Sequence, residues 1–221
     1  MVEKDLFGFI ENFDKPTFAI ENNLNGSVAG IDEAGRGPLC GPVFASCVLL
    51  NRNVFPKNLN DSKKIKEKER ENIFEEIVNF EKRGLLFYGI ASVSAEIIDR
   101  INIREATKLA MKNAYENLVE KYGEIVGFSV NNVIVDGNFV PSIDVNAISV
   151  VKGDQKSLSI ACASIVAKVS RDRELVAMDK LYPVYGWVKN KGYGTKEHIE
   201  AIKKFGLVNG YHRKSFCKSF V

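Results

Sequence analysis

The sequence predicts an α/β fold in which helices cover a mixed sheet. Short apolar runs typical of strands are interspersed with longer segments whose apolar residues recur at helical spacing. The chain has 221 residues with 45% hydrophobic content, so it can bury the core that such a fold requires. We expect strands at residues 28–31, 41–50, 85–93, 131–137 and 147–151.

Helices are expected between and after these strands. In residues 62–83, apolar side chains from Ile65 onward recur near helical spacing among many charges, which predicts an amphipathic surface helix. Residues 102–122 repeat the helical pattern. Ser157 is placed to cap a long helix and Thr195 to cap another, because short polar side chains can bind the free N–H groups of a first turn.

Positive charge is concentrated near the C-terminus. The formal net charge is only +3, but residues 186–221 carry eight Lys or Arg against Glu197 and Glu200, a net charge of +6 that leaves −3 on the rest of the chain. A solvated basic surface explains this by itself, and a segment that faces phosphates is the sharper hypothesis. Charge alone favours the first, so the motifs must decide.

The cysteines show no CxxC spacing and lie among apolar or small residues, which indicates reduced, buried thiols rather than a zinc site or disulfides. They are Cys40, Cys47, Cys162 and Cys217. The first residues lack a basic region followed by an apolar run, and no stretch is long enough to span a membrane. We therefore expect a cytoplasmic protein without a membrane partner.

Four acids share one context, since each lies where an apolar strand gives way to a Gly-containing turn: Asp32, Glu33, Asp136 and Asp154. Taken alone, Asp136 would be read as a turn former. If the strands are neighbours, however, the carboxylates converge, and their mutual repulsion must be relieved by cations or bound protons. Adjacent residues of a strand point to opposite faces, so Asp32 and Glu33 share a site only if the chain twists or ends there.

Carboxylate oxygens without histidine or thiolate suit Mg²⁺ or Mn²⁺ rather than zinc. Two such ions, about 4 Å apart, can activate a water and stabilise the leaving oxygen of an in-line phosphoryl transfer. The sequence therefore predicts phosphodiester hydrolysis.

Seven segments together resemble ribonuclease HII, and the likeness spans nearly the whole chain from Gly30. They are IDEAGRGPLCGPV at 31–43, NDSKK at 60–64, INIREATKLAM at 101–111, VDGN at 135–138, KGDQKSLSIACASIVAKVSRD at 152–172, KGYGTKEH at 191–198 and HRKSF at 212–216. The resemblance implies a ribonuclease H-like fold, with a five-stranded mixed sheet flanked by helices. We expect an N-terminal extension at residues 1–26, a catalytic domain at 27–185 and a small, basic helical extension at 186–221.

The resemblance also implies the activity. Members of the family hydrolyse the RNA strand of RNA/DNA hybrids and cut on the 5′ side of single ribonucleotides embedded in duplex DNA. The products carry 3′-hydroxyl and 5′-phosphate ends, and the family's role is ribonucleotide removal from DNA. Partners are therefore RNA/DNA hybrid and ribonucleotide-containing duplex DNA, and nothing in the sequence demands more than a monomer.

Residue by residue, Asp32, Glu33, Asp136 and Asp154 match the family's four metal-binding acids. Gly35, Arg36 and Gly37 match a GRG segment that reads the ribose 2′-hydroxyl largely through backbone groups. Glycine permits close approach of the main chain, and the 2′-hydroxyl is what distinguishes RNA from DNA. We expect Arg36 to face phosphate.

Tyr193 matches the tyrosine that packs against the sugar at the junction between ribonucleotide and deoxyribonucleotide; without the resemblance it would be read as a surface aromatic. Lys63, Lys168 and Arg171 are candidate phosphate contacts, with helix-surface ion pairs as the alternative for Lys63 and Arg171. Ser164 can bond a phosphate or simply pack a helix. With no cysteine or second histidine at ligand spacing, neither His198 nor His212 is expected to bind a metal.

Three alternatives stay open. Ribonuclease HIII resembles the same fold but usually has GTG in place of GRG and a sizeable N-terminal domain, whereas only 31 residues precede Asp32 in this sequence. A non-catalytic hybrid-binding module would need no complete set of acids. A nuclease that cuts junctions or is blind to sequence would use the same acids, so only GRG and Tyr193 favour ribonucleotide recognition.

Overall fold

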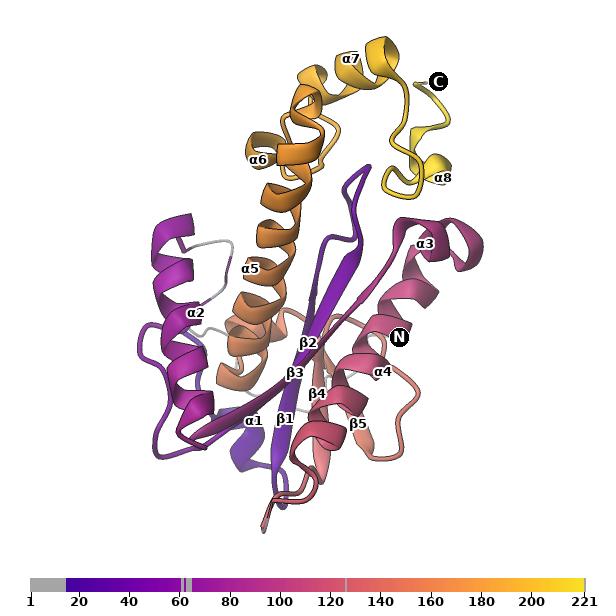
Figure 1. The fold of residues 1–221 in the computed structure, drawn as a ribbon. Coiled ribbons are helices and arrows are strands. Elements are labelled where there is room, and N and C mark those ends of the chain that lie inside the picture. The colour runs from indigo at the N-terminus through magenta and orange to yellow at the C-terminus, as the bar shows by residue number, and fades with distance from the viewer. Residues whose placement is uncertain (1–14, 61, 63–64, 126, 221) are drawn as a thin grey trace.

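Five strands form one mixed sheet with helices on both faces (Figure 1). The computed structural model describes residues 15–60, 62, 65–125 and 127–220. The strand order is β3-β2-β1-β4-β5; β1, β2 and β3 are antiparallel neighbours, and β4 and β5 run parallel to β1. This confirms the predicted fold class. The strands are β1 Val28–Ala34, β2 Val43–Leu50, β3 Leu86–Val93, β4 Asn132–Asp136 and β5 Asn146–Val150.

Central strand β1 is covered on both faces, so its sequence is a continuous buried run rather than an alternating one. One face packs against α4 and the other against α5, with α2 beside α5. The first half of α5 is buried all round because small residues let it lie close to the sheet. The helices that cover the two faces are α2 Glu67–Lys82, α3 Ala95–Ile101, α4 Ile103–Tyr122 and α5 Leu158–Leu181.

The predicted caps are confirmed, whereas one helix boundary is not. Ser157 Oγ accepts the Ile160 N–H at 3.1 Å, and Thr195 Oγ1 accepts the His198 N–H at 3.3 Å. The helix expected over residues 62–83 begins only at Glu67, so Ile65 lies before it and is buried in the core cluster that α2 and α5 share. Two helices, α1 Ala19–Asn22 and α3, were not predicted, since neither is long enough for a clear hydrophobic period.

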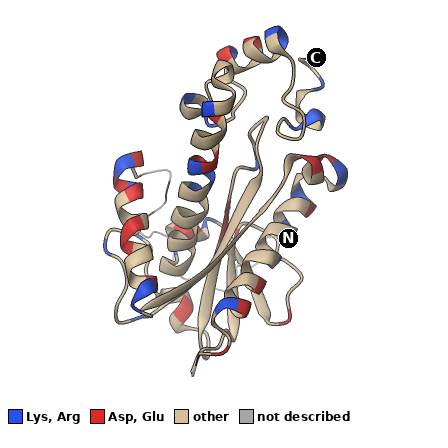
Figure 2. Cartoon of the chain, viewed as in Figure 1, with Lys and Arg blue, Asp and Glu red and all other residues tan. Residues whose placement is uncertain are grey.

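The C-terminal helices lie beyond the β1–β2 hairpin and pack around the buried Trp187 (Figure 1). They are α6 Trp187–Asn190, α7 Lys196–Phe205 and α8 Lys214–Cys217. Figure 2 shows Lys and Arg along these helices. Arg213 is fully buried, however, so the basic excess counted from the sequence overstates the charge that faces solvent.

Two expectations concern the N-terminus and membranes. Within the described residues, no helix combines the length and apolar character needed to cross a bilayer. Of the expected N-terminal extension, residues 1–14 lie outside the described part of the chain, while residues 15–26 include α1.

Close approach of α5 to β1 depends on Gly30. A methyl group at this position would overlap the backbone of Ser159 and Ile160, which cannot move without displacing the helix. We expect Gly30→Ala to lower the free energy of unfolding by about 3 kcal/mol. Urea unfolding checks this against Gly84→Ala, where no atom lies within 4 Å of the added methyl and only a positive φ of 66° opposes it. The control should lose about 1 kcal/mol, and equal losses would contradict the packing argument.

Candidate active site

Two of the acids leave the sheet side by side. The parallel pairing of β1 with β4 ends at Ile31 opposite Val135, so Asp32 and Asp136 are the next residues on neighbouring strands. Asp32 is buried, which raises its pKa well above the usual range of an aspartate, and the negative charges of Glu33 and Asp136 raise it further. The site therefore concentrates negative charge in a region of low water access.

Asp154 is carried next to Asp136 by a tight turn. Asp136 Oδ1 accepts the N–H of Gly153 at 2.6 Å, and the buried Asp154 follows in the 3-10 turn Gly153–Gln155 after β5. A methyl group at Gly153 would lie 2.6 Å from Ile160 Cδ1 and 3.3 Å from Asp136 Oδ1, so a larger residue would have to displace the end of the Ile160 side chain. The motif KGD thus places its acid beside the end of β4.

Glu33 reaches the same region despite following Asp32 directly. Beyond the last pair with β4, β1 continues only against β2 and ends at Ala34. The Glu33 N–H bonds Asp32 Oδ1 at 2.7 Å, and both residues line one hollow of about 280 Å³. Glu33 Oε1 also lies 3.3 Å from Arg36 Nη1. The end of the strand therefore brings the adjacent acids to one site.

The hollow gathers most of the site residues expected from the sequence. Asp136 and Asp154 lie outside its lining, and Lys63 lies outside the described residues. Ser62 was missed: its Oγ lies 2.7 Å from Ser164 Oγ, and the NDSKK motif that contains it was used only for its lysine. The lining residues are Asp32, Glu33, Ala34, Gly35, Arg36, Gly37, Ser62, Ser164, Lys168, Arg171 and Tyr193.

The two cations from α5 differ in how they are held. Lys168 Nζ lies 2.7 Å from Asp172 Oδ1, and burial lowers the pKa of Lys168. Arg171 is only 1% exposed, and both of its terminal nitrogens donate to the Lys191 carbonyl at 3.1 Å. Lys168 is therefore the more accessible of the two cations, with 25% of its side chain exposed, whereas Arg171 is held by the loop that contains Lys191.

Tyr193 stands at the rim of the hollow beside the GRG turn. It is 49% exposed, and its Cε1 would lie 3.5 Å from a methyl group placed on Gly37. Its carbonyl oxygen lies 2.9 Å from His198 Nδ1. The ring thus faces solvent while its backbone is held from inside, an arrangement suited to packing against a bound sugar.

Near Tyr193 the structure brings the two histidines together with a cysteine, which their spacing in the sequence does not suggest. Cys40, His198 and His212 are buried together, with possible ligand atoms within 4.8 Å of one another. Sequence spacing could not show this, because the three residues come from separate segments that meet only in the fold. Their hydrogen bonds decide what the cluster is.

Those bonds fix the protons on both imidazoles. The Val208 N–H donates to His212 Nδ1 at 2.8 Å, so the His212 proton lies on Nε2, which is 3.2 Å from His198 Nε2. Trp187 Nε1–H also donates to His198 Nε2, at 2.9 Å, and His198 Nδ1 donates to Tyr193. Each Nε2 is thus engaged in the hydrogen-bond network, which argues for a structural pair rather than a metal site.

We expect this pair to make stability depend on pH. Burial, together with the neighbouring His198, lowers the pKa of His212 to about 4, whereas an unfolded histidine titrates near 6.5. The stabilisation is present above pH 6.5 and is lost as the pH falls towards 4, on the order of 2 kcal/mol. Urea unfolding at pH 7 and pH 4.5 measures it. Because carboxylates titrate in the same range, His212→Gln is the reference, and an equal loss in parent and variant would contradict the assignment.

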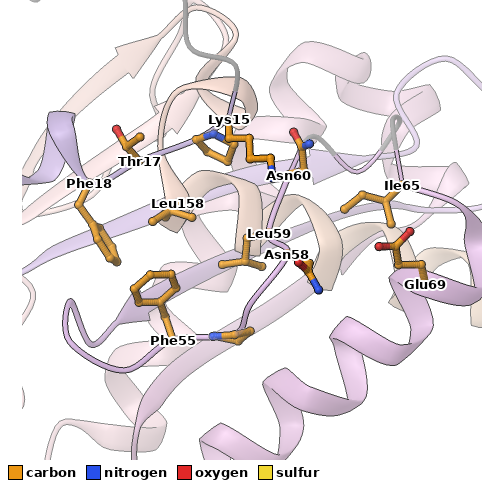
Figure 3. Close-up of a pocket in the computed structure, with 12 residues that line it drawn as sticks. Lys15, Thr17, Phe18, Phe55, Asn58, Leu59, Asn60, Ile65, Glu69 and Leu158 are labelled. Atoms are coloured by element: carbon orange, nitrogen blue, oxygen red, sulfur yellow. The ribbon is translucent and has the colours of Figure 1, made fainter.

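A second hollow, of about 480 Å³, lies away from these acids (Figure 3). Phe18 and Phe55 meet edge to face across it at 5.1 Å. Glu69 is the single acid among its described lining residues. This hollow therefore lacks the cluster of several carboxylates on which hydrolysis would depend.

Comparison with known proteins finds relatives of a single family over most of the chain. The family model of ribonuclease HII matches residues 29–219. Curated proteins named ribonuclease HII include one from Caldicellulosiruptor bescii, 46% identical over 94% of this chain and 97% of its own length. Another, from Acetivibrio thermocellus, is 50% identical over 99% of this chain and 80% of its own length.

Solved structures share the fold. Ribonuclease H2 from Pyrococcus horikoshii superposes with a TM-score of 0.70 at 23% identity, covering 88% of this chain and 97% of that one. Bst-RNase HIII in complex with Mn²⁺ gives 0.69 at 16% identity, covering 87% of this chain and 68% of that one. The second of these chains is therefore longer than this one.

Proposed function

Because the chain belongs to the ribonuclease HII family and is a metal-dependent endoribonuclease, we propose that it recognises the ribonucleotide itself. It hydrolyses the RNA strand of RNA/DNA hybrids, cuts 5′ to single ribonucleotides in duplex DNA and leaves 3′-hydroxyl and 5′-phosphate ends. The observation that carries the proposal is the hollow in which Gly35, Gly37 and Tyr193 lie beside Asp32 and Glu33. The role of the protein is ribonucleotide removal from DNA. It acts as a monomer in the cytoplasm.

The donor set fits a hard divalent cation. Carboxylates alone, from Asp32, Glu33, Asp136 and Asp154, would hold Mg²⁺ or Mn²⁺. Burial raises the pKa of Asp32 and the neighbouring negative charges of Glu33 and Asp136 raise it further, and a bound cation would offset both effects. A solved relative, Bst-RNase HIII, binds Mn²⁺. When bound, a pair of such ions supplies water activation and charge stabilisation at the leaving oxygen.

The other residues bind and orient the substrate. Backbone groups of the GRG turn face the ribose 2′-hydroxyl, and Tyr193 packs against the next sugar. Arg36, which is exposed, and Lys168 contact phosphates and hold the scissile bond over the acids. Recognition and cleavage are therefore coupled, because the residues that read the sugar border those that cut beside it.

A panel of three labelled duplexes tests this proposal: DNA with one ribonucleotide, all-DNA, and RNA/DNA hybrid, each with Mg²⁺, Mn²⁺ or chelator. We expect one metal-dependent cut 5′ to the single ribonucleotide, cutting of the hybrid, and intact DNA. Cutting of the hybrid alone would favour activity like that of ribonuclease HIII. Equal cutting of all-DNA would overturn ribonucleotide recognition, and binding without cleavage would indicate a hybrid-binding module.

Tyr193→Ala should lower kcat/KM at a single ribonucleotide by roughly tenfold or more, because a stacked aromatic ring contributes about 1–3 kcal/mol. Tyr193→Phe keeps the ring and should retain most of the activity. Cleavage rates on the single-ribonucleotide duplex measure both. An alanine variant as active and selective as the parent would remove Tyr193 from the site.

A further inference from the structure

A segment near the C-terminus lies directly against the chain that follows the GRG turn. His212 pairs with Cys40 in an antiparallel bridge. The Gly41 N–H donates to the Tyr211 carbonyl and the Arg213 N–H to the Leu39 carbonyl, both at 2.8 Å. The backbone of this segment is therefore fixed independently of the Arg213 side chain.

The Arg213 side chain lies under the turn, and all of its N–H groups donate to backbone carbonyls. Its residue exposure is 0%. Nε donates to Gly41, Nη1 to Arg36 and Pro38, and Nη2 to Gly35 and Gly41, over 2.6 to 3.0 Å. These bonds use all five N–H groups that a guanidinium offers.

A buried cation is costly, and burial together with Arg171 lowers the pKa of Arg213 to about 10. The group still carries its charge near neutral pH. An apolar side chain would avoid the desolvation cost but would leave the carbonyls of the turn without donors. The guanidinium therefore determines which way these carbonyls point.

Turning the carbonyls inward leaves the opposite edge of the turn available. Within the described chain, the N–H groups of Arg36 and Gly37 donate to no backbone acceptor. Both residues line the hollow that contains Asp32 and Glu33. The planar guanidinium of Arg213 fixes the carbonyl edge of the turn, which leaves the N–H edge facing the position of a bound sugar.

We propose that Arg213 is a positioning residue for ribonucleotide recognition, holding the GRG turn so that its backbone meets the 2′-hydroxyl beside the carboxylates. This inference rests on the proposed function. Arg213 itself touches no substrate; it acts through the carbonyls of Gly35, Arg36, Pro38 and Gly41.

Arg213→Lys keeps the charge but loses the planar fork. We expect kcat/KM on the single-ribonucleotide duplex to fall by about tenfold to a hundredfold, as expected for misplacement of a reacting group. The fall should lie mainly in kcat, with KM within about threefold, because phosphate contacts are unchanged. Guanidinium at millimolar concentration should partly restore Arg213→Ala. The matched control is Arg173→Lys, at an exposed position of α5 where the side chain pairs with Glu71 and Glu75 of α2, and it should behave like the parent.

Hydrogen exchange gives a readout that does not depend on cleavage. Amides of residues 34–41 should exchange faster in Arg213→Lys than in Arg173→Lys, while β1 before Asp32 and α4 stay as protected as in the parent. If Arg213→Lys exchanged at the parent's rate and kept the parent's kcat, the inference would be overturned. Faster exchange throughout the chain in this variant would also overturn it, because it indicates a merely structural role. If the parent itself fails to cut at ribonucleotides, the proposed function fails, and exchange at the turn still decides whether Arg213 holds it.

Discussion

Asp136→Asn is expected to lower cleavage about a thousandfold while leaving duplex binding intact. The asparagine Oδ1 can still accept the Gly153 N–H, so the turn that carries Asp154 should stay in place. The substitution removes one negative charge from the acids that would hold the cations. A thousandfold slower cleavage corresponds to a loss of about 4 kcal/mol of transition-state stabilisation.

Single-turnover cleavage and a binding titration in chelator measure the two effects separately. Asp144→Asn is the matched control, because it makes the same chemical change at an exposed acid outside the hollow. Undiminished cleavage by Asp136→Asn would remove this residue from the catalytic group. Loss of binding as well would indicate that the substitution disturbs the fold.

Gly35→Ala should be the most damaging change within the GRG turn. Gly35 has a φ of 96°, and a methyl group there would overlap Arg171 Nε, whose guanidinium is held by the Lys191 carbonyl. We expect a loss of about 2 kcal/mol in the free energy of unfolding. Cleavage at a single ribonucleotide should fall about a hundredfold, because the turn is displaced from the acids.

Gly37→Ala separates stability from recognition in the same motif. Its added methyl would lie 3.5 Å from Tyr193 Cε1, an ordinary contact, so the free energy of unfolding should change by less than about 1 kcal/mol. Urea unfolding and cleavage rates are measured on both variants. Equal losses of stability at the two positions would contradict the account of Gly35.

The sheet and the acids could be predicted because their causes are local. Apolar runs show the strands, Ser157 and Thr195 show the helix starts, and each of the four acids lies at or shortly after the end of a strand within its own motif. Parallel pairing of β1 with β4 then brings Asp32 beside Asp136, as expected for neighbouring strands. The position of Asp154 also has a local cause, because it depends on Gly153 of the same KGD motif.

What supports the site could not be predicted, because it depends on contacts between distant segments. Arg213 Nη2 reaches the carbonyl of Gly35 across 178 positions, and backbone carbonyls leave no trace in a sequence pattern. The charge count therefore placed Arg213 in a basic tail. The buried pairing of His198 with His212 was hidden for the same reason, since spacing alone suggested two unrelated histidines.

Recognition of the 2′-hydroxyl is tested most directly by changing that group alone. Duplexes carrying a single 2′-hydroxyl, 2′-deoxy, 2′-fluoro or 2′-O-methyl nucleotide at one position are compared for rate and site of cleavage with Mg²⁺. We expect cutting on the 5′ side of the 2′-hydroxyl nucleotide and at least a hundredfold slower cutting of the others, since a hydrogen-bonding site left unpaired discriminates strongly. Comparable cutting of the 2′-deoxy or 2′-fluoro duplex would show that the chain cleaves without reading the ribose.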